Sequence, residues 1–291
     1  MLKLIRRPFM QAVETPCIFL NEGLISMDYE IDIAHQTIIG EKTTSEVFSL
    51  LAKKELLKVD EIGHLYHIKV KEDIYKNSDS NIRYVEELSI LHHNLVVYTN
   101  STGQITDVVN RRAIKEEWET ISPKLYSKYK KDPNTIKYVT NVQQMLSDKD
   151  HFLEYIRNHS LIKALFPDIY HLEVGKQLVK TSNVREPGTG IEMPIFMIGT
   201  PTLDEKRSTI EILQIGKLDK ERFDGQPLTR TLRKIYEIPH LPVEIDLNVF
   251  ETCELDTSFK MLEKTRCQEI QIGPEYLHRH VIKTSLRKTE L

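Results

Sequence analysis

Two stretches near opposite ends of the chain alternate apolar and polar residues with a period of two, and this pattern limits the fold more than any other feature. One runs from Met27 to Ile33, with acids at every second position, and the other from Val243 to Val249. Successive side chains of a β-strand point to opposite faces of a sheet. Both stretches are therefore predicted to be strands with one buried and one solvated face.

A hairpin is predicted between residues 95 and 109. Two β-rich runs, Leu95–Thr99 and Ile105–Val109, flank a polar break that ends at Gly103. Glycine readily adopts the positive φ that closing such a loop requires. Asn110 follows directly, and its side chain is expected to cap the first turn of a helix.

The apolar period changes to that of helices for about sixty residues after this hairpin. Helical spacing predicts one helix with Trp118, a second near 136–146, a third that begins at Asp148 and a short fourth that ends before Pro167. A further short helix is predicted from Ser80 to Leu91, before the hairpin.

Strand patterns return after Leu172. Strands are predicted at 195–198, 209–215 and 243–249, then at 259–262, 269–272 and 280–286, with a short helix near 228–236. In the first third of the chain, residues 66–70 are predicted to form a strand. Residues 47–57 fit either a helix or strands, and a pair of strands is favoured. The fold class predicted is α+β, with an antiparallel, curved β-sheet and an inserted helical segment at about 110–170. Three regions are expected: β-rich residues 1–109, helical residues 110–170 and β-rich residues 171–291.

Composition excludes several partners and locations. With 40 Lys+Arg against 43 Asp+Glu, a net charge of -3 provides no general attraction to nucleic acid or anionic lipid. The basic amino terminus lacks the apolar run of a secretory signal, and no stretch approaches about 18 apolar residues. A cytoplasmic protein is therefore expected. Eleven glycines in 291 residues argue against a dinucleotide-binding enzyme, and three cysteines without CxxC spacing predict reduced thiols.

Histidine pairs are the candidates for a metal site. His278 and His280 would share one face of a strand, and His92–His93 and the pair His64 and His67 are the alternatives. Because no third ligand is fixed by spacing, surface or packing histidines are favoured. We predict no catalytic, cofactor-binding or metal-binding residue and no cofactor; a hydrolase nucleophile motif is missing, and the loop at 188–190 lacks a phosphate-binding lysine.

One basic and aromatic segment could contact nucleic acid. Lysines and arginines between Arg111 and Lys131 accompany Tyr126 and Tyr129, a combination found in single-strand binders. Glutamates at 116, 117 and 119 interrupt it, so a solvated helix face is favoured and nucleic acid is not an expected partner.

Three functions remain open from the sequence. The first is a non-enzymatic cytoplasmic protein that acts through protein-protein contacts, as an assembly component, adaptor or toxin-neutralising partner, with another chain or a second copy as partner. The second is a hydrolase with a dispersed histidine and acidic site. The third is a carrier of an apolar ligand in the curved sheet, which should contain a closed apolar cavity of at least about 300 Å³.

Overall fold

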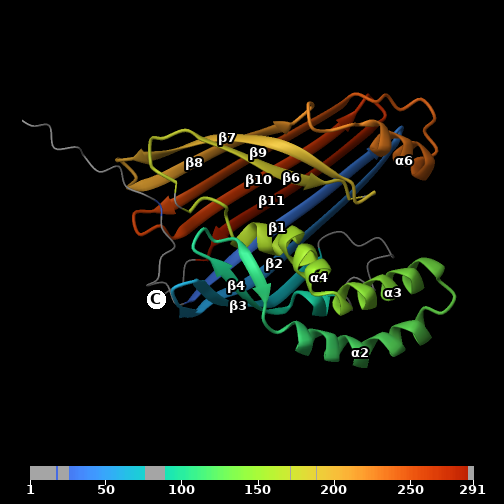
Figure 1. Ribbon diagram of the computed structural model, residues 1–291, viewed down its shortest axis with the longest axis horizontal. Coiled ribbons are helices and arrows are strands. Elements are labelled where there is room, and N and C mark those ends of the chain that lie inside the picture. Colours follow the sequence, from blue (N-terminus) through green and yellow to red (C-terminus); the bar gives the residue numbers. More distant parts are fainter. Residues whose placement is uncertain (1–17, 19–25, 76–88, 171, 188, 288–291) are drawn as a thin grey trace, which may run out of the picture.

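The computed structural model describes residue 18 and residues 26–75, 89–170, 172–187 and 189–287 (Figure 1). Within these residues the strands form one sheet of 11 strands, and every neighbouring pair is antiparallel. This confirms the predicted antiparallel sheet. The strands are β1 Ser26–Ile39, β2 Lys42–Val59, β3 Gly63–Tyr75, β4 Asn94–Asn100, β5 Ile105–Val108, β6 Leu178–Arg185, β7 Glu192–Asp204, β8 Thr209–Leu218, β9 Ile245–Asp256, β10 Met261–Ile272 and β11 Tyr276–Leu286.

The first and last strands pair with each other at the centre of the sheet. The order is β5-β4-β3-β2-β1-β11-β10-β9-β8-β7-β6, so each remaining strand lies beside its neighbour in the sequence. The register of β1 and β11 runs from Tyr29 opposite Leu286 to Ile39 opposite Tyr276. The two β-rich regions of the sequence are therefore two halves of one sheet.

Four of the helices lie between β5 and β6 in the sequence, as the helical period predicts. They are α2 Arg111–Lys128, α3 Pro133–Ser147, α4 Lys149–Asn158 and α5 Ser160–Leu165; α6, Gln226–Tyr236, follows β8, and η1, Ser89–Leu91, is a single 3₁₀ turn before β4. Helix α5 contacts the two central strands, β1 and β11, and α4 contacts β5. No helix in the described residues is long and apolar enough to cross a membrane.

The predicted cap at Asn110 is wrong, and the capping segment predicted at 147–150 does start helix α4, with Asp148 as its N-cap. The Asn110 side chain makes no cap hydrogen bond, because its oxygen accepts from the Val96 amide and its nitrogen donates to the Asn94 carbonyl, both at 2.8 Å. It therefore ties the start of α2 to β4. The Asp148 carboxylate accepts from the amides of Asp150 and His151 at the start of α4.

Two strand boundaries also differ from the prediction. The ambiguous segment near 47–57 belongs to the single long strand β2. Residues 261–262 of one predicted strand and all of the other, 269–272, belong to the single strand β10. The middle of β10 carries Lys264 and Arg266 on the face that the apolar residues share. The helix predicted from Ser80 lies mostly outside the described residues, and its end at Leu91 is the 3₁₀ turn.

The inner face of the sheet carries two separate apolar clusters. One lies under α2–α5 and includes Trp118, Phe152 and Ile282, and the other lies under α6 and includes Leu228 and Tyr276. Figure 1 shows α4 in front of the sheet and α6 near one end of the strands. The apolar core is thus divided into two clusters. Polar side chains occupy the inner face of the sheet between them.

Candidate ligand-binding site

A belt of polar side chains crosses the inner face between the two apolar clusters. On β9, Glu251 lies between Val249 of one cluster and Cys253 of the other. On β10, the cations Lys264 and Arg266 likewise lie between residues of the two clusters. Because alternate residues of a strand share a face, these polar side chains point to the same side as the core. We call them the polar belt: Gln214, Glu251, Lys264, Arg266, Gln268, His278 and His280.

The centre of the belt is a buried carboxylate with two cations. The Glu251 carboxylate lies 3.2 Å from Nζ of Lys264 and 2.6 Å from Nη1 of Arg266. Glu251 and Lys264 are 5% and 4% exposed. Burial by itself would raise the pKa of Glu251, but the charges of Lys264 and Arg266 outweigh burial and lower this pKa to about 2. The carboxylate is therefore ionised at neutral pH.

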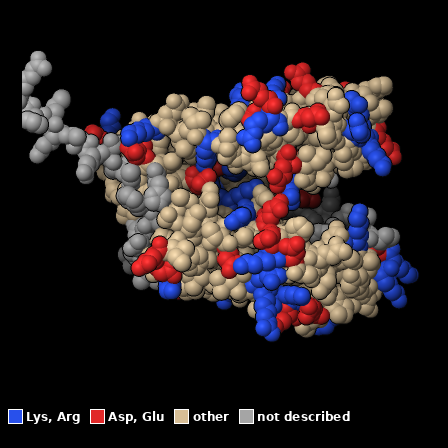
Figure 2. Space-filling model, in the orientation of Figure 1, with Lys and Arg blue, Asp and Glu red and all other residues tan. Residues whose placement is uncertain are grey.

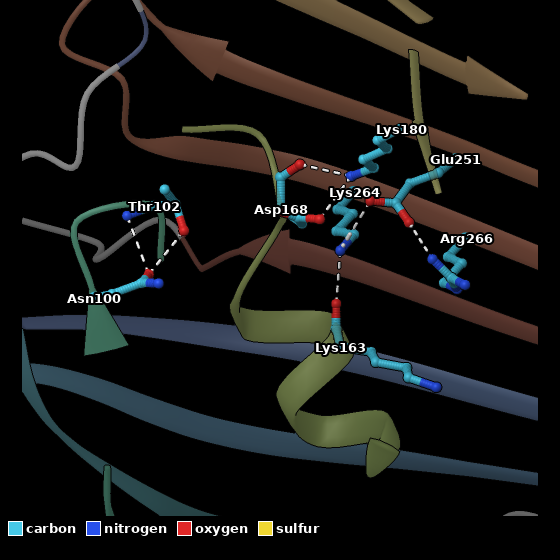
Figure 3. A network of polar contacts seen from close by, with 8 residues as sticks. All are labelled: Asn100, Thr102, Lys163, Asp168, Lys180, Glu251, Lys264 and Arg266. Carbon is cyan, nitrogen blue, oxygen red and sulfur yellow. Dashed lines mark hydrogen bonds and ion pairs between the residues drawn. The ribbon is translucent and has the colours of Figure 1, made fainter. Parts of the chain in front are cut away.

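Two more lysines lie beside the belt, Lys163 on α5 and Lys180 on β6. Nζ of Lys264 donates to the backbone carbonyl oxygen of Lys163 at 2.6 Å, which fixes α5 against β10 (Figure 3). The Lys180 ammonium on β6 donates to the carboxylate and the carbonyl oxygen of Asp168, at 2.8 and 2.9 Å. Burial, together with the charges of Arg266 and Lys264, lowers the pKa of Lys163 to about 8.

These side chains line a pocket of about 520 Å³ between the helical segment and strands β6–β10. Figure 2 shows a hollow in this part of the molecule, with Lys and Arg atoms at its bottom. Its apolar lining comes from Ile105, Ile162, Phe166 and Met197. Its charged lining is Arg157, Lys163, Lys180, Lys264, Arg266, Asp168 and Glu251. The pocket therefore combines apolar wall with an excess of positive charge.

The histidine pair predicted as the best metal candidate packs inside the protein. The His280 ring stacks on His35 with centroids 4.2 Å apart, and Nδ1 of His278 lies 3.1 Å from the Thr37 hydroxyl. In the described part of the chain, no three His, Cys, Asp or Glu side chains converge as a metal site would require. The alternative pairs also make ring contacts: His92 packs against His93 and His159, and His64 against Tyr66.

The basic segment of α2 is a surface with internal ion pairs. Arg112 pairs with Glu116 at 2.9 Å, and Lys115 lies 3.9 Å from Glu119. The Tyr126 hydroxyl lies 2.9 Å from the Thr140 hydroxyl of α3. The predicted solvated helix face agrees with these contacts, and nucleic-acid binding is not tested by them.

A second groove, of about 710 Å³, lies on the outer face of β7–β10. Neighbouring strands align partly exposed apolar residues there, with Ile198 opposite Ile215 and Ile215 opposite Phe250. The charged residues at its edge pair with each other, since Arg207 lies 2.9 Å from Glu211 and 3.4 Å from Glu254. This groove therefore offers an apolar surface without a buried charge that needs a partner.

The sequence pattern missed the residues of the inner pocket. Lys163, Lys180, Glu251 and Lys264 come from one helix and three strands, and only the sheet order brings them together. Within β10, however, Lys264 and Arg266 continue the period-two pattern of the buried face. From this continued pattern, the sequence could have predicted that both cations face the core.

No family model and no curated protein sequence matches this chain. Among solved structures it is similar to one described as lipid-protein interactions in lipovitellin, with a TM-score of 0.47 and 9% identity over 94% of this chain. The chain spans only 26% of that protein. It is also similar to the outer membrane protein Omp33 of Acinetobacter baumannii, with a TM-score of 0.20 and 6% identity over 90% of this chain and 99% of the other. The corresponding values for an outer membrane channel of Pseudomonas putida F1 are 0.19, 6%, 90% and 96%.

These comparisons correct two predictions made from the sequence. The matched structures concern lipid contacts and outer membranes, which contradicts the cytoplasmic localisation and the assembly, adaptor or toxin-neutralising function. Neither prediction is retained. Likenesses with such low TM-scores carry no argument for a particular function, so the function of this chain has to be inferred from its own pocket.

Proposed function

We propose that this protein is a carrier that holds an apolar or amphiphilic ligand in the pocket between the helical segment and the sheet. The observation that carries the proposal is the pocket of about 520 Å³ on the inner face, in which apolar and cationic side chains meet. Sites for small ligands commonly enclose about 300–1,000 Å³. The space thus fits a ligand of ordinary size, such as one medium-length acyl chain.

The apolar side of the pocket suits a hydrocarbon chain. Ile162 and Phe166 on the helical side face the space that Met197 lines from β7. Removing hydrocarbon from water contributes about 25 cal/mol for each Å² of apolar surface that is buried. Because Ile162, Phe166 and Met197 are themselves largely buried, most of this gain would come from the hydrocarbon of the ligand as it leaves water.

The pocket differs from the closed apolar cavity that a carrier is expected to contain. It is open to solvent (Figure 2), and many of its lining residues are polar. An open pocket allows a ligand to enter and leave without unfolding of the sheet. Strands β6–β10 supply the sheet side of the pocket, against which the ligand would bind.

A photoactivatable probe tests this proposal. Dodecanoate and dodecanol that carry a diazirine should label the purified protein saturably, and the labelled peptides should contain Ile162, Phe166 or Met197. The substitution Ser182→Trp, at an exposed pocket residue of β6, should fill the space and reduce labelling. The matched control is Thr181→Trp, since Thr181 is exposed on the opposite face of the same strand.

Two outcomes would contradict a carrier that uses this pocket. Labelling that does not saturate with either probe would exclude a defined site. Labelling of peptides with Ile215 and Phe250, unchanged by Ser182→Trp, would place the ligand in the outer groove instead.

A further inference from the structure

The charges that line the pocket do not balance. Five cationic side chains face two carboxylates there. Glu251 is already shared by Lys264 and Arg266, and Asp168 by Lys180. The remaining positive charge lies in a partly enclosed space, where a charge interacts more strongly with a neighbour than it does in bulk water.

Lys163 carries one of these unbalanced positive charges. Its carbonyl oxygen accepts from Lys264, but its own ammonium group makes no hydrogen bond or ion pair with any residue that the structure describes. Figure 3 shows the ammonium at the end of an extended side chain, apart from the other labelled groups. Keeping an ammonium partly buried beside Lys264 and Arg266 costs free energy. An anion in the pocket would offset that cost.

Gln214 gives a second, independent indication of a missing ligand. It lies on β8, lines the same pocket and is 1% exposed. Neither its amide nitrogen nor its amide oxygen has a hydrogen-bond partner among the described residues. Buried polar side chains nearly always have a partner, and an unsatisfied one costs about 1–3 kcal/mol. The Gln214 nitrogen is thus a second donor for an anionic oxygen, weaker than the Lys163 ammonium because it is neutral.

From these two groups we infer that the pocket selects ligands with an anionic oxygen head group, a carboxylate or a phosphate, attached to a hydrocarbon chain. Lys163 and Gln214 donate to the head group, and Ile162, Phe166 and Met197 contact the chain. The inference rests on the proposed carrier function and adds the chemistry of the ligand. Lys264 and Arg266 remain paired with Glu251, so the ion pairs of the polar belt do not depend on the ligand.

Matched probes separate the head group from the chain. Dodecanoate, dodecanol and inorganic phosphate are each titrated into the protein by calorimetry at pH 7. Dodecanoate should bind at least about tenfold more tightly than dodecanol, since a hydrogen bond to a charged group contributes about 1.5–3 kcal/mol. The affinity for dodecanoate should fall as the pH rises through about 8, where Lys163 loses its proton.

Variants assign that preference to the two groups. Lys163→Met should reduce the preference for dodecanoate to less than about threefold, because it removes a charged hydrogen bond and leaves the backbone contact with Lys264 in place. Gln214→Met should weaken dodecanoate binding while the protein stays at least as stable, since the lost amide has no partner. The control Lys217→Met removes an exposed cation from the outer face of β8 and should change neither affinity.

The failures of the two proposals are distinguishable. If dodecanoate and dodecanol bind equally well, the head-group site is wrong and the carrier stands. If neither binds, both are wrong. If phosphate binds as tightly as dodecanoate, the ligand is not an amphiphile, since the hydrocarbon chain then contributes nothing to binding.

Discussion

Lys264 on β10 donates from Nζ to the backbone carbonyl oxygen of Lys163, over 2.6 Å, and so joins the sheet to helix α5. The same ammonium lies 3.2 Å from the Glu251 carboxylate. One buried cation therefore connects a helix to two adjacent strands at the wall of the pocket. The stability of this contact depends on the carboxylate that balances it.

Replacing Glu251 by glutamine should destabilise the protein strongly. The change removes the negative charge and leaves Lys264 and Arg266 inside without it, and breaking a buried ion pair in this way costs about 3–5 kcal/mol. The free energy of unfolding in urea at pH 7 measures the loss. Glu116→Gln, at the exposed ion pair with Arg112, is the matched control and should cost less than about 1 kcal/mol. Equal losses for the two variants would show that Glu251 is not a buried partner.

The alternating strands could be predicted from the sequence, because side-chain period is a local property of the backbone. The stretch at 27–33 belongs to β1 and the one at 243–249 to β9, which begins at Ile245. The hairpin near Gly103 was equally clear, since its loop residues restrict the backbone locally. What the pattern lacks is the order of the strands, including the pairing of β1 with β11 between residues about 250 positions apart.

The polar belt could not be predicted for a related reason. A lysine in an alternating strand is usually assigned to the solvated face, so Lys264 and Arg266 divided β10 into two predicted strands. Their burial is tolerated only because Glu251 lies on the adjacent strand β9, and the register that places it opposite Arg266 is not given by the side-chain period. The Asn110 cap could not be predicted for the same reason, because its side chain is used by two backbone partners on β4.

Lys54 should make the stability rise as the pH is raised from neutral. Its ammonium donates to the Leu165 carbonyl at 3.0 Å and lies 4.0 Å from the Phe166 ring centroid. Burial and the charge of Lys264 lower its pKa to about 7, against about 10.4 in an unfolded chain. Between these values the unfolded state binds more protons than the folded state, so the free energy of unfolding increases with pH.

Lys54→Met tests this assignment. The variant keeps an unbranched side chain of similar length but cannot be protonated, so its stability should rise less between pH 7 and 10 than that of the wild type. Thermal or urea unfolding at several pH values in that range gives the two slopes. Lys163 contributes its own smaller rise above pH about 8, which both proteins retain. Identical slopes would show that the Lys54 ammonium is not buried.

Acidification should destabilise the protein through the stacked rings of His35 and His280. Burial, and next the charge of a neighbouring histidine, lowers the pKa of His35 to about 4 and that of His280 to about 2. Their pKa in an unfolded chain is near 6.5, so the unfolded state takes up protons first as the pH falls from 6.5 towards 4. The stability that the neutral rings provide is therefore lost in this range.

His280→Phe should reduce this acid sensitivity. Phenylalanine keeps a planar ring against His35 and cannot be protonated, although the Ser160 hydroxyl loses its contact with the imidazole. The midpoint of urea unfolding, measured from pH 7 to pH 4, should fall less steeply for the variant than for the wild type. A fall of the same steepness in both would mean that His280 titrates normally and lies in contact with water.

Truncation should destabilise the protein much more on the inner face of β8 than on its outer face. Ile212 is 2% exposed and belongs to the core beneath the helices, whereas its neighbour Leu213 is 45% exposed on the outer face. Ile212→Ala should therefore lower the free energy of unfolding by about 2–5 kcal/mol, the usual cost of an emptied core position. Leu213→Ala should cost less than about 1 kcal/mol, because water already reaches much of that side chain. Urea unfolding at pH 7 measures both, and comparable losses would show that the outer groove is covered in solution.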